Sequence, residues 1–377
     1  MTHRERFRAV MKYEKYDRLP LVHFGFWSEL VKKWADEKRF SRHLLERCYD
    51  GSPNEQIIGG MLGFDYNYFT VFKDRSKSIL ASLYPGFEEK LIETLPDGSQ
   101  KWLNHCGLIQ LRVPGATSIP AEVDWLFKDR ATWEELFLPK LQYSPDRIDW
   151  DKLEALKAQN ETREHVMGLF AGSLFGQIRD MLGIVNVSYL LVDDEDLYDE
   201  IIDTVGQLCY DITYAILSSG VKLDFAHYFE DICYNHGPLV NPAVFARKVG
   251  PWYKKINNMI RSFGIDIIVV DSDGKIDELL PVWLDNGVNT FFPIEVGTWN
   301  ASIAPWREKY GKNLRGVGGV NKHVLSQDRA AIDRELERIR ALVELGGFIP
   351  CLDHRVAPDA EWDLILYYTD RYRTIFG

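Results

Sequence analysis

The chain has 377 residues, of which 46% are hydrophobic and 27% are charged, a composition typical of a folded globular protein. Acidic residues number 56 and basic residues 45, and the resulting net charge of −11 disfavours nucleic acid as a partner. The five cysteines form no Cys-x-x-Cys pair, which argues against a disulfide framework or a cysteine-rich zinc site.

The N-terminal residues are charged rather than apolar, and no run of 18 apolar residues occurs in the chain. A secretory signal and a membrane-spanning helix are therefore not expected. We expect a cytoplasmic protein.

Short apolar runs predict eight strands in chain order. The first half contains Leu19–Phe24, Asp65–Val71 and His165–Ala171. The second half alternates such runs with longer amphipathic segments, a pattern typical of parallel strands joined by helices. Its predicted strands are Leu223–Phe229, Asp266–Val270, Thr290–Ile294, Leu314–Val317 and Phe348–Leu352. Eight strands close a (β/α)8 barrel, so the sequence predicts an α/β protein with a single TIM-barrel domain over residues 1–377.

Three long helices are marked by their end signals. One runs from Asp193 to Ser219. The next begins at Asn241-Pro242, an N-cap followed by proline, and is expected to continue to Gly264. The third begins near Ser326 and ends at a pair of glycines.

One region does not fit the alternation of strands and helices. Ser78 to Pro114 contains a turn signal at Glu93–Ser99 between two β-like runs. The pattern predicts a β-hairpin insertion after the second strand. We expect this insertion to lie over the mouth of the barrel, as a lid or as a surface for a partner.

Polar residues follow the predicted strands at the barrel end where active sites lie. They are His23, Glu230, Asp231, Asp271, Asp273, Glu295, Asn321, Lys322, Asp353, His354 and Arg355. The acids together with His354 suit a divalent metal such as zinc, or they serve as general acid, general base and hydrogen-bonding groups without a metal. Structural roles are also open, such as a helix cap at Asp273 or an ion pair at Glu295.

Several segments resemble the uroporphyrinogen decarboxylase superfamily. They are Arg4–Met11, Asp17–Pro20, Gly318–Lys322, Gly346–Pro350 and the Asp353-His354 pair. The resemblance runs from the N-terminus to the C-terminus and implies a (β/α)8 barrel. It also implies one of two chemistries: decarboxylation of a tetrapyrrole without a cofactor, or methyl transfer to or from a corrinoid, with zinc in several members.

Two departures from the decarboxylase pattern favour the methyltransferase branch. Decarboxylases carry an arginine-rich segment just after the first strand, to bind the carboxylates of the substrate, whereas this chain has Val22–Trp27 without an arginine. The aspartate expected at the end of the second strand is replaced by Tyr68–Val71. The zinc-binding positions of the superfamily match Asp271, Asp273 and His354, and such hard ligands suit a methyl group bound to oxygen or nitrogen rather than a thiol acceptor.

The resemblance therefore implies a corrinoid-dependent methyltransferase that demethylates a small, aromatic or O-methyl substrate. The expected catalytic residues are Glu230, Asp273 and Glu295, and the expected metal ligands are Asp271, Asp273 and His354. The expected substrate-binding residues are His23, Phe26, Trp27, Tyr68, Phe292 and Lys322. The chain lacks the Asp-x-His-x-x-Gly signature of corrinoid-binding domains, so a separate corrinoid protein is the expected partner.

Other expectations stay open beside this one. Decarboxylation of the uroporphyrinogen type is one alternative, and a barrel that binds a small ligand without catalysis is another. Neither nucleic acid nor a membrane is an expected partner. A homodimer is a reasonable expectation for a barrel of this size.

Overall fold

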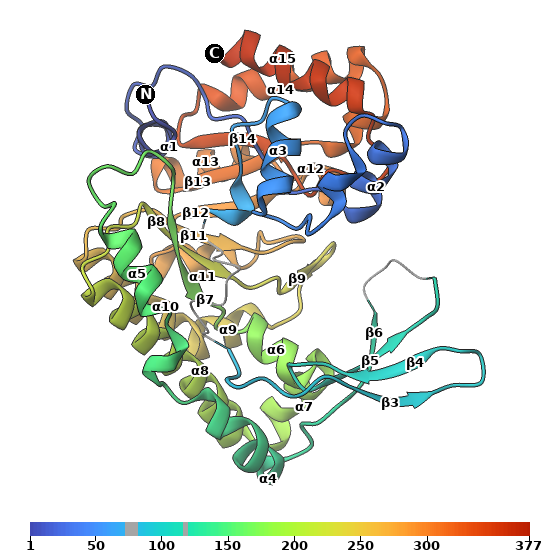
Figure 1. Ribbon diagram of the computed structural model, residues 1–377. Coiled ribbons are helices and arrows are strands. Elements are labelled where there is room, and N and C mark those ends of the chain that lie inside the picture. The colour runs from blue at the N-terminus through green and yellow to red at the C-terminus, as the bar shows by residue number, and fades with distance from the viewer. Residues whose placement is uncertain (72–81, 116–119) are drawn as a thin grey trace.

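The computed structural model describes residues 1–71, 82–115 and 120–377 (Figure 1). Eight parallel strands form one curved sheet in the order β2-β1-β14-β13-β12-β11-β8-β7. They are β1 (Val22–His23), β2 (Tyr66–Asn67), β7 (Gly168–Gly172), β8 (Phe225–Phe229), β11 (Ile268–Asp271), β12 (Thr290–Ile294), β13 (Arg315–Val320) and β14 (Phe348–Leu352). Each overlaps one strand predicted from the sequence. Neighbours in the sheet follow one another along the chain, except that β1, the first of the eight strands, pairs with β14, the last.

The two end strands of this sheet, β2 and β7, meet next to each other. The backbone N–H of Gly168, at the start of β7, donates to the carbonyl of Val71, just after β2, at 2.6 Å. Among the described residues this bond joins the two strands, and we call the junction between β2 and β7 the seam. The seam closes the curved sheet into a ring, which confirms the predicted α/β barrel.

Helices surround the ring (Figure 1). They are α1 (His3–Met11), α2 (Ser28–Asp36), α3 (Pro53–Met61), α4 (Arg130–Thr132), α5 (Trp150–Lys157), α6 (Gly176–Leu182), α7 (Ile184–Asp193), α8 (Glu195–Ser218), α9 (Pro242–Lys248), α10 (Gly250–Ser262), α11 (Leu280–Asp285), α12 (Val296–Trp299), α13 (Ile303–Tyr310), α14 (Arg329–Val343) and α15 (Trp362–Phe376). No helix in the described part of the chain is long and apolar enough to cross a membrane.

The helix expected between Asn241 and Gly264 is divided in two. It ends at Lys248, and α10 starts afresh at Gly250. Pro251, in the first turn of α10, has no N–H to bond to the previous turn, and its ring opposes a continuous helix. The prediction of one helix was wrong because it used the apolar spacing and ignored this proline.

The insertion is larger than the predicted hairpin. Four antiparallel strands form a separate sheet: β3 (Lys90–Thr94), β4 (Gln100–Leu103), β5 (Leu108–Arg112) and β6 (Ala121–Trp125). The predicted turn at Glu93–Ser99 does join β3 to β4. β5 adds a third strand within the predicted insertion, and β6 extends the sheet beyond Pro114. The start of the predicted insertion, residues 78–81, lies outside the described residues. We call the described part of residues 90–125 the arm.

The arm projects from the barrel and is fixed at its base (Figure 1). Gly107 has a φ of +94°, and a side chain there would meet the rings of Phe87 and Phe137, so a glycine lets the backbone approach these rings closely. At the same end of the sheet, where Trp125 pairs with Leu108, the ring of Trp125 lies against Gly183, which precedes α7. Because α6 and α7 follow the C-terminal end of β7, the arm stands on the mouth side of the barrel.

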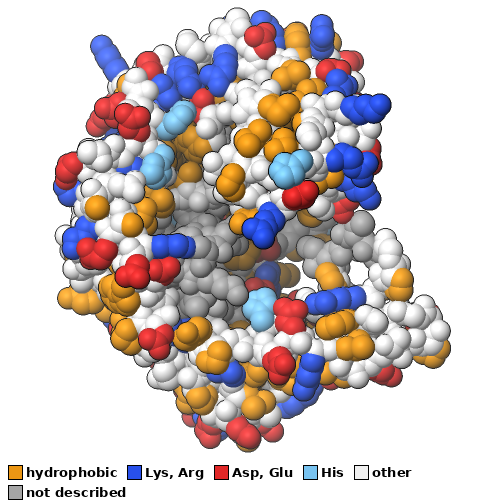
Figure 2. All heavy atoms as spheres, in the orientation of Figure 1, with side chains coloured by type: hydrophobic (Ala, Val, Ile, Leu, Met, Phe, Trp, Pro, Cys, Tyr) orange, Lys and Arg blue, Asp and Glu red, His pale blue; other side chains and the backbone are white. Residues whose placement is uncertain are grey.

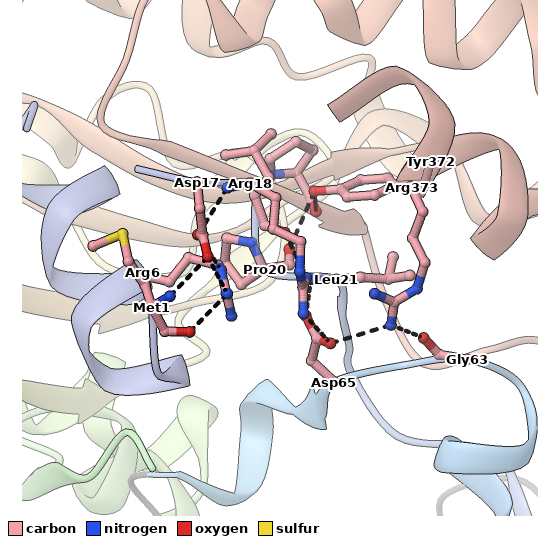
Figure 3. Close-up of polar contacts among 12 residues, drawn as sticks. Met1, Arg6, Asp17, Arg18, Pro20, Leu21, Gly63, Asp65, Tyr372 and Arg373 are labelled. Carbon is pink, nitrogen blue, oxygen red and sulfur yellow. Dashed lines mark hydrogen bonds and ion pairs between the residues drawn. The ribbon is translucent and has the colours of Figure 1, made fainter. Parts of the chain in front are cut away.

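The N-terminal segment that resembles the superfamily makes structural contacts at the outside of the ring (Figure 3). Arg18 binds Asp65 through two hydrogen bonds of 2.6 and 2.8 Å, and Arg373 of α15 reaches the same carboxylate at 3.2 Å. Arg6 binds Asp17 in the same two-pronged way, at 2.7 and 2.8 Å. These contacts join the start of the chain to β2 and to the last helix.

Candidate active site

Glu230, which follows β8, is fully buried and engaged by the neighbouring loop. Its carboxylate accepts hydrogen bonds from the N–H groups of Leu174, Phe175 and Gly176 at 2.7 to 2.9 Å, and one from the hydroxyl of Tyr253. Burial raises the pKa of Glu230, and these donors oppose that rise. The carboxylate therefore holds the start of α6 in place. Its expected catalytic role stays a prediction.

Two more strand-end acids bind neighbouring loops in the same way. Glu295, after β12, accepts from the N–H of Gly274 at 2.6 Å and from the hydroxyl of Thr298 at 2.9 Å. Asp353, after β14, accepts from the N–H groups of Gly297 at 2.6 Å and Lys322 at 3.0 Å. Each carboxylate ties the loop after one strand to the loop after another. Burial and the nearby charge of Asp273 raise the pKa of Glu295.

Asp273 and His354 form a pair that is open to the mouth of the barrel. Asp273 Oδ2 lies 3.6 Å from His354 Nε2, and the two side chains are 37% and 22% exposed. The ring of Trp27 stacks on His354, with a centroid distance of 6.0 Å and an interplanar angle of 19°. Phe24 contacts the same imidazole at 5.5 Å. An imidazole beside a carboxylate and between aromatic rings can exchange a proton with a bound molecule.

Aromatic rings line the space below this pair. Phe292 lies 4.6 Å from Phe24 and 4.8 Å from Tyr68, measured between ring centroids. Deeper still, His227 Nε2 lies 3.3 Å from Asp271 Oδ2, and both side chains are buried. Figure 2 shows that this face of the molecule is hollowed between the body of the barrel and the arm.

The rim near Asp273 carries a further ion pair. Arg179 Nη1 of α6 lies 3.7 Å from Asp231 Oδ2. Burial raises the pKa of Asp231, and the charge of Asp273 contributes to that rise, so the two carboxyls are neighbours. The rim therefore offers both signs of charge to a bound molecule.

Two expected substrate-binding residues lie away from this site. His23 points out of the ring, where its Nε2 lies 3.4 Å from Glu55 Oε1 of α3 and its Nδ1 accepts a hydrogen bond from the N–H of Gly25 at 3.0 Å. Phe26 stacks on the same imidazole at 4.6 Å. Burial lowers the pKa of His23 to about 3. The structure thus places Trp27 at the mouth and Tyr68 and Phe292 in the buried interior below it, whereas His23 and Phe26 lie away from this site.

The expected zinc ligands do not come together. Asp273 pairs with His354, whereas Asp271 pairs with His227, which is not one of the expected ligands. Within the described ranges, no group of three His, Cys, Asp or Glu side chains is arranged to hold a metal ion. A zinc site with at least three protein ligands does not fit this arrangement, and we derive no step through a metal.

Similar structures support the fold. No protein-family model matches this sequence, and no curated protein matches it. A methyltransferase from Methanosarcina mazei is similar over 99% of this chain and 99% of its own, with 13% identity and a TM-score of 0.58. A B12-independent methionine synthase from Shewanella sp. W3-18-1, in complex with selenomethionine, is similar over 95% of this chain and 98% of its own, with 9% identity and a TM-score of 0.42.

The first of these similarities shows that the barrel fold is shared. The second is too weak to carry an argument.

Sequence reasoning found Arg355 at the end of the last strand but missed two residues near the mouth, Phe24 and Asp50. Phe24 directly follows His23, and the alternation of side chains along a strand was the signal that places it inside the ring. Arg355 binds Asp50 at 2.5 Å, and its guanidinium lies 5.4 Å from the centre of the Phe69 ring. Asp50 follows no strand, so no strand-end argument could find it.

Proposed function

We propose that this chain is a methyl-transferring enzyme that takes the methyl group of a small O-methylated aromatic substrate and passes it to the corrinoid of a separate protein. The observation that carries the proposal is the exposed Asp273–His354 pair, with the ring of Trp27 stacked on it. The fold shared with a methyltransferase over nearly the whole of both chains supports it. So does the resemblance of the N-terminal and strand-end segments to the uroporphyrinogen decarboxylase superfamily, together with the departures that favour its methyltransferase branch.

Breaking a methyl–oxygen bond requires stabilisation of the departing oxygen. When the methyl group moves to the reduced cobalt of the partner, the electron pair of the C–O bond stays on the oxygen, which then needs a proton or a positive charge. A protonated His354 would supply that proton, and Asp273 would stabilise the imidazolium beforehand. Trp27 and Phe24 would stack on the aromatic ring and exclude water.

We propose the arm as the surface that contacts the corrinoid protein. The arm stands on the mouth side of the barrel, and its sheet is separate from the barrel sheet. Several apolar side chains of the arm are exposed. These side chains are Leu91, Ile92, Val113 and Val123. Exposed apolar groups gathered on one element are typical of protein contacts.

The test is methyl transfer from 2-methoxyphenol to free reduced cobalamin, followed by absorbance. We expect His354→Gln and Asp273→Asn to lower kcat at least about 100-fold, because each removes part of the proton donor. His43→Gln and Asp359→Asn, at exposed positions outside the pair, are the matched controls and should keep the wild-type rate. An unchanged rate in His354→Gln would contradict the proposed role of the pair.

A barrel that binds a ligand without catalysis is a second candidate. Glu230, Glu295 and Asp353 bind neighbouring loops, so three of the strand-end acids have a structural task that needs no reaction. Under this alternative 2-methoxyphenol would bind in calorimetry, and Trp27→Ala would weaken that binding, while no methyl transfer would occur with wild-type protein.

A further inference from the structure

A groove lies at the end of the barrel opposite the mouth. It has a volume of about 290 Å³ and is lined by α1 and by the segments that precede β8 and β11. Asp273 and His354, by contrast, come after strands β11 and β14. In Figure 1, α1 and the arm lie on opposite sides of the ring. A ligand in this groove would therefore leave the mouth free.

One wall of the groove is cationic. Arg4, Arg8 and Lys12 recur at every fourth residue, so they lie on one side of α1 and its C-terminal end, and all three line the groove. Lys222, before β8, also lines it. This is a concentration of positive charge in a chain whose net charge is −11.

The carboxylates near this wall do not neutralise all of its positive charge. Asp224 is shared between Arg4, at 2.7 Å, and the buried Arg163, at 3.0 Å. Asp266 lies 3.9 Å from Lys12.

Lys222 binds Glu161 at 2.5 Å. Arg8 is exposed, and no ion pair to it occurs among the described residues. Five cationic side chains thus meet three carboxylates.

Repulsion among these cations is visible at Arg163. Burial lowers its pKa, and the charges of Arg4 and Arg8 lower it further, against the opposing effect of Asp224. A bound anion would relieve this repulsion, because it would add negative charge beside Arg4 and Arg8.

The other wall of the groove is apolar. It is formed by Leu217, Val221, Leu223, Phe263 and Ile265. Phe263, at the end of α10, is 41% exposed, and its ring contacts that of Tyr214 edge-on at a centroid distance of 6.2 Å. An inorganic ion has no apolar surface to pack against this wall, whereas a molecule with a hydrocarbon part would cover it.

We infer that the groove binds a small amphipathic anion, with its charged head at Arg8 and Lys12 and its hydrocarbon part against Phe263. The head is a carboxylate or a phosphate monoester, since both accept hydrogen bonds from guanidinium and ammonium groups. This site is separate from the Asp273–His354 pair and does not depend on the proposed function.

The test measures binding of hexanoate, hexyl phosphate, 1-hexanol and inorganic phosphate by titration calorimetry at constant ionic strength. We expect saturable binding of hexanoate or hexyl phosphate, and the tighter of the two identifies the head group. 1-Hexanol and inorganic phosphate, which each lack one half of the ligand, should bind at least about fivefold more weakly.

Variants locate the site. Arg8→Gln, Lys12→Gln and Phe263→Ser should each weaken hexanoate binding about fivefold. Lys32→Gln, on the exposed side of α2, is the matched control and should bind as the wild type does. The inference is overturned if neither hexanoate nor hexyl phosphate binds saturably, or if Arg8→Gln and Lys12→Gln bind both normally. It is also overturned if Trp27→Ala abolishes binding, since the ligand would then occupy the mouth.

Discussion

Glu230 and Asp273 are both carboxylates that follow strands of the ring, but their surroundings give them different properties. Three backbone N–H groups point at Glu230, and removing its oxygens would leave these donors buried without acceptors. Asp273 faces an imidazole and the open mouth. We therefore interpret Glu230 as a group that shapes the site and Asp273 as a group available to a ligand.

His23 gives a prediction for acid stability. Its pKa is lowered by burial to about 3, whereas in the unfolded chain it lies near 6.5. Below about pH 6.5 the unfolded state binds a proton that the folded state does not, so stability falls as the pH falls towards 3. Between pH 7 and pH 5 the loss from this residue is about 2 kcal/mol.

Urea unfolding at pH 7 and pH 5 measures this loss. His23→Gln keeps a polar side chain without the titration and should lose about 2 kcal/mol less than the wild type over the same interval. His43→Gln, at an exposed histidine, is the control and should show the wild-type loss. Equal pH dependence in His23→Gln and the wild type would show that His23 is not buried as described.

The site could be predicted only in part, because the sequence does not show which side of the ring each residue of β1 faces. Strand-end reasoning found Asp273 and His354, and Trp27 and Phe292 were among the expected substrate-binding residues. His23 and Phe26 were placed in the mouth because they surround the end of β1. Successive side chains of a strand face opposite sides, so a difference of one residue decides whether His23 or Phe24 faces the interior.

At the scale of elements, the barrel strands were predictable and the arm was not. The eight barrel strands are apolar on both faces because the ring has a filled interior and a helical cover. The outer strands β3 and β6 are mostly exposed and carry polar residues such as Glu93, Glu122 and Asp124. β6 does alternate apolar and acidic residues, but it lies beyond Pro114, where the predicted insertion ended, so only the hairpin with its turn residues was found.

The arm gives a prediction about the partner. Leu91→Asp and Ile92→Asp change exposed side chains, so the free energy of unfolding should change by less than about 0.5 kcal/mol. If the arm contacts the corrinoid protein, the KM for that protein should rise about tenfold in each variant, because a charge would be buried in an apolar contact.

Two controls separate docking from chemistry. The rate with free reduced cobalamin should be unchanged in the arm variants. Val192→Asp, at an 82% exposed position on α7, should leave the KM for the corrinoid protein unchanged. An unchanged KM in both arm variants would exclude the arm as the docking surface.

At the scale of the whole molecule, contacts around Asp65 join distant parts of the chain (Figure 3). The carboxylate binds Arg18 before β1 and Arg373 in the last helix, and it accepts the N–H of Leu21 at 2.9 Å. The hydroxyl of Tyr372 donates to the carbonyls of Pro20 and Pro350, each at 3.2 Å. The first and last segments thus stabilise each other against the strands of the ring.

Asp65 should therefore contribute more to the free energy of unfolding than Asp17 does. Asp65→Ala leaves Arg18 and the Leu21 N–H without their acceptor and should cost about 2 to 4 kcal/mol in urea unfolding at pH 7. Burial raises the pKa of Asp65, but hydrogen bonds from Arg18 and Leu21 outweigh this and leave it lowered. The contribution is present above about pH 4 and is lost as the pH falls through the lowered pKa.

Asp17→Ala is the matched control, because Asp17 also binds an arginine but is 41% exposed. It should cost less than about 1 kcal/mol. Equal losses in the two variants would contradict the description of Asp65 as the junction between the segments.

The seam has a mechanical consequence for the barrel. Its described hydrogen bond, from Gly168 to Val71, makes it the sparsest contact between neighbouring strands in the described ring, and the chain leaves the ring there to build the arm. Opening of the ring at the seam would break this single bond without breaking a ladder of several pairs. Hydrogen exchange would report such an opening beside Tyr68 first at the amide of Gly168.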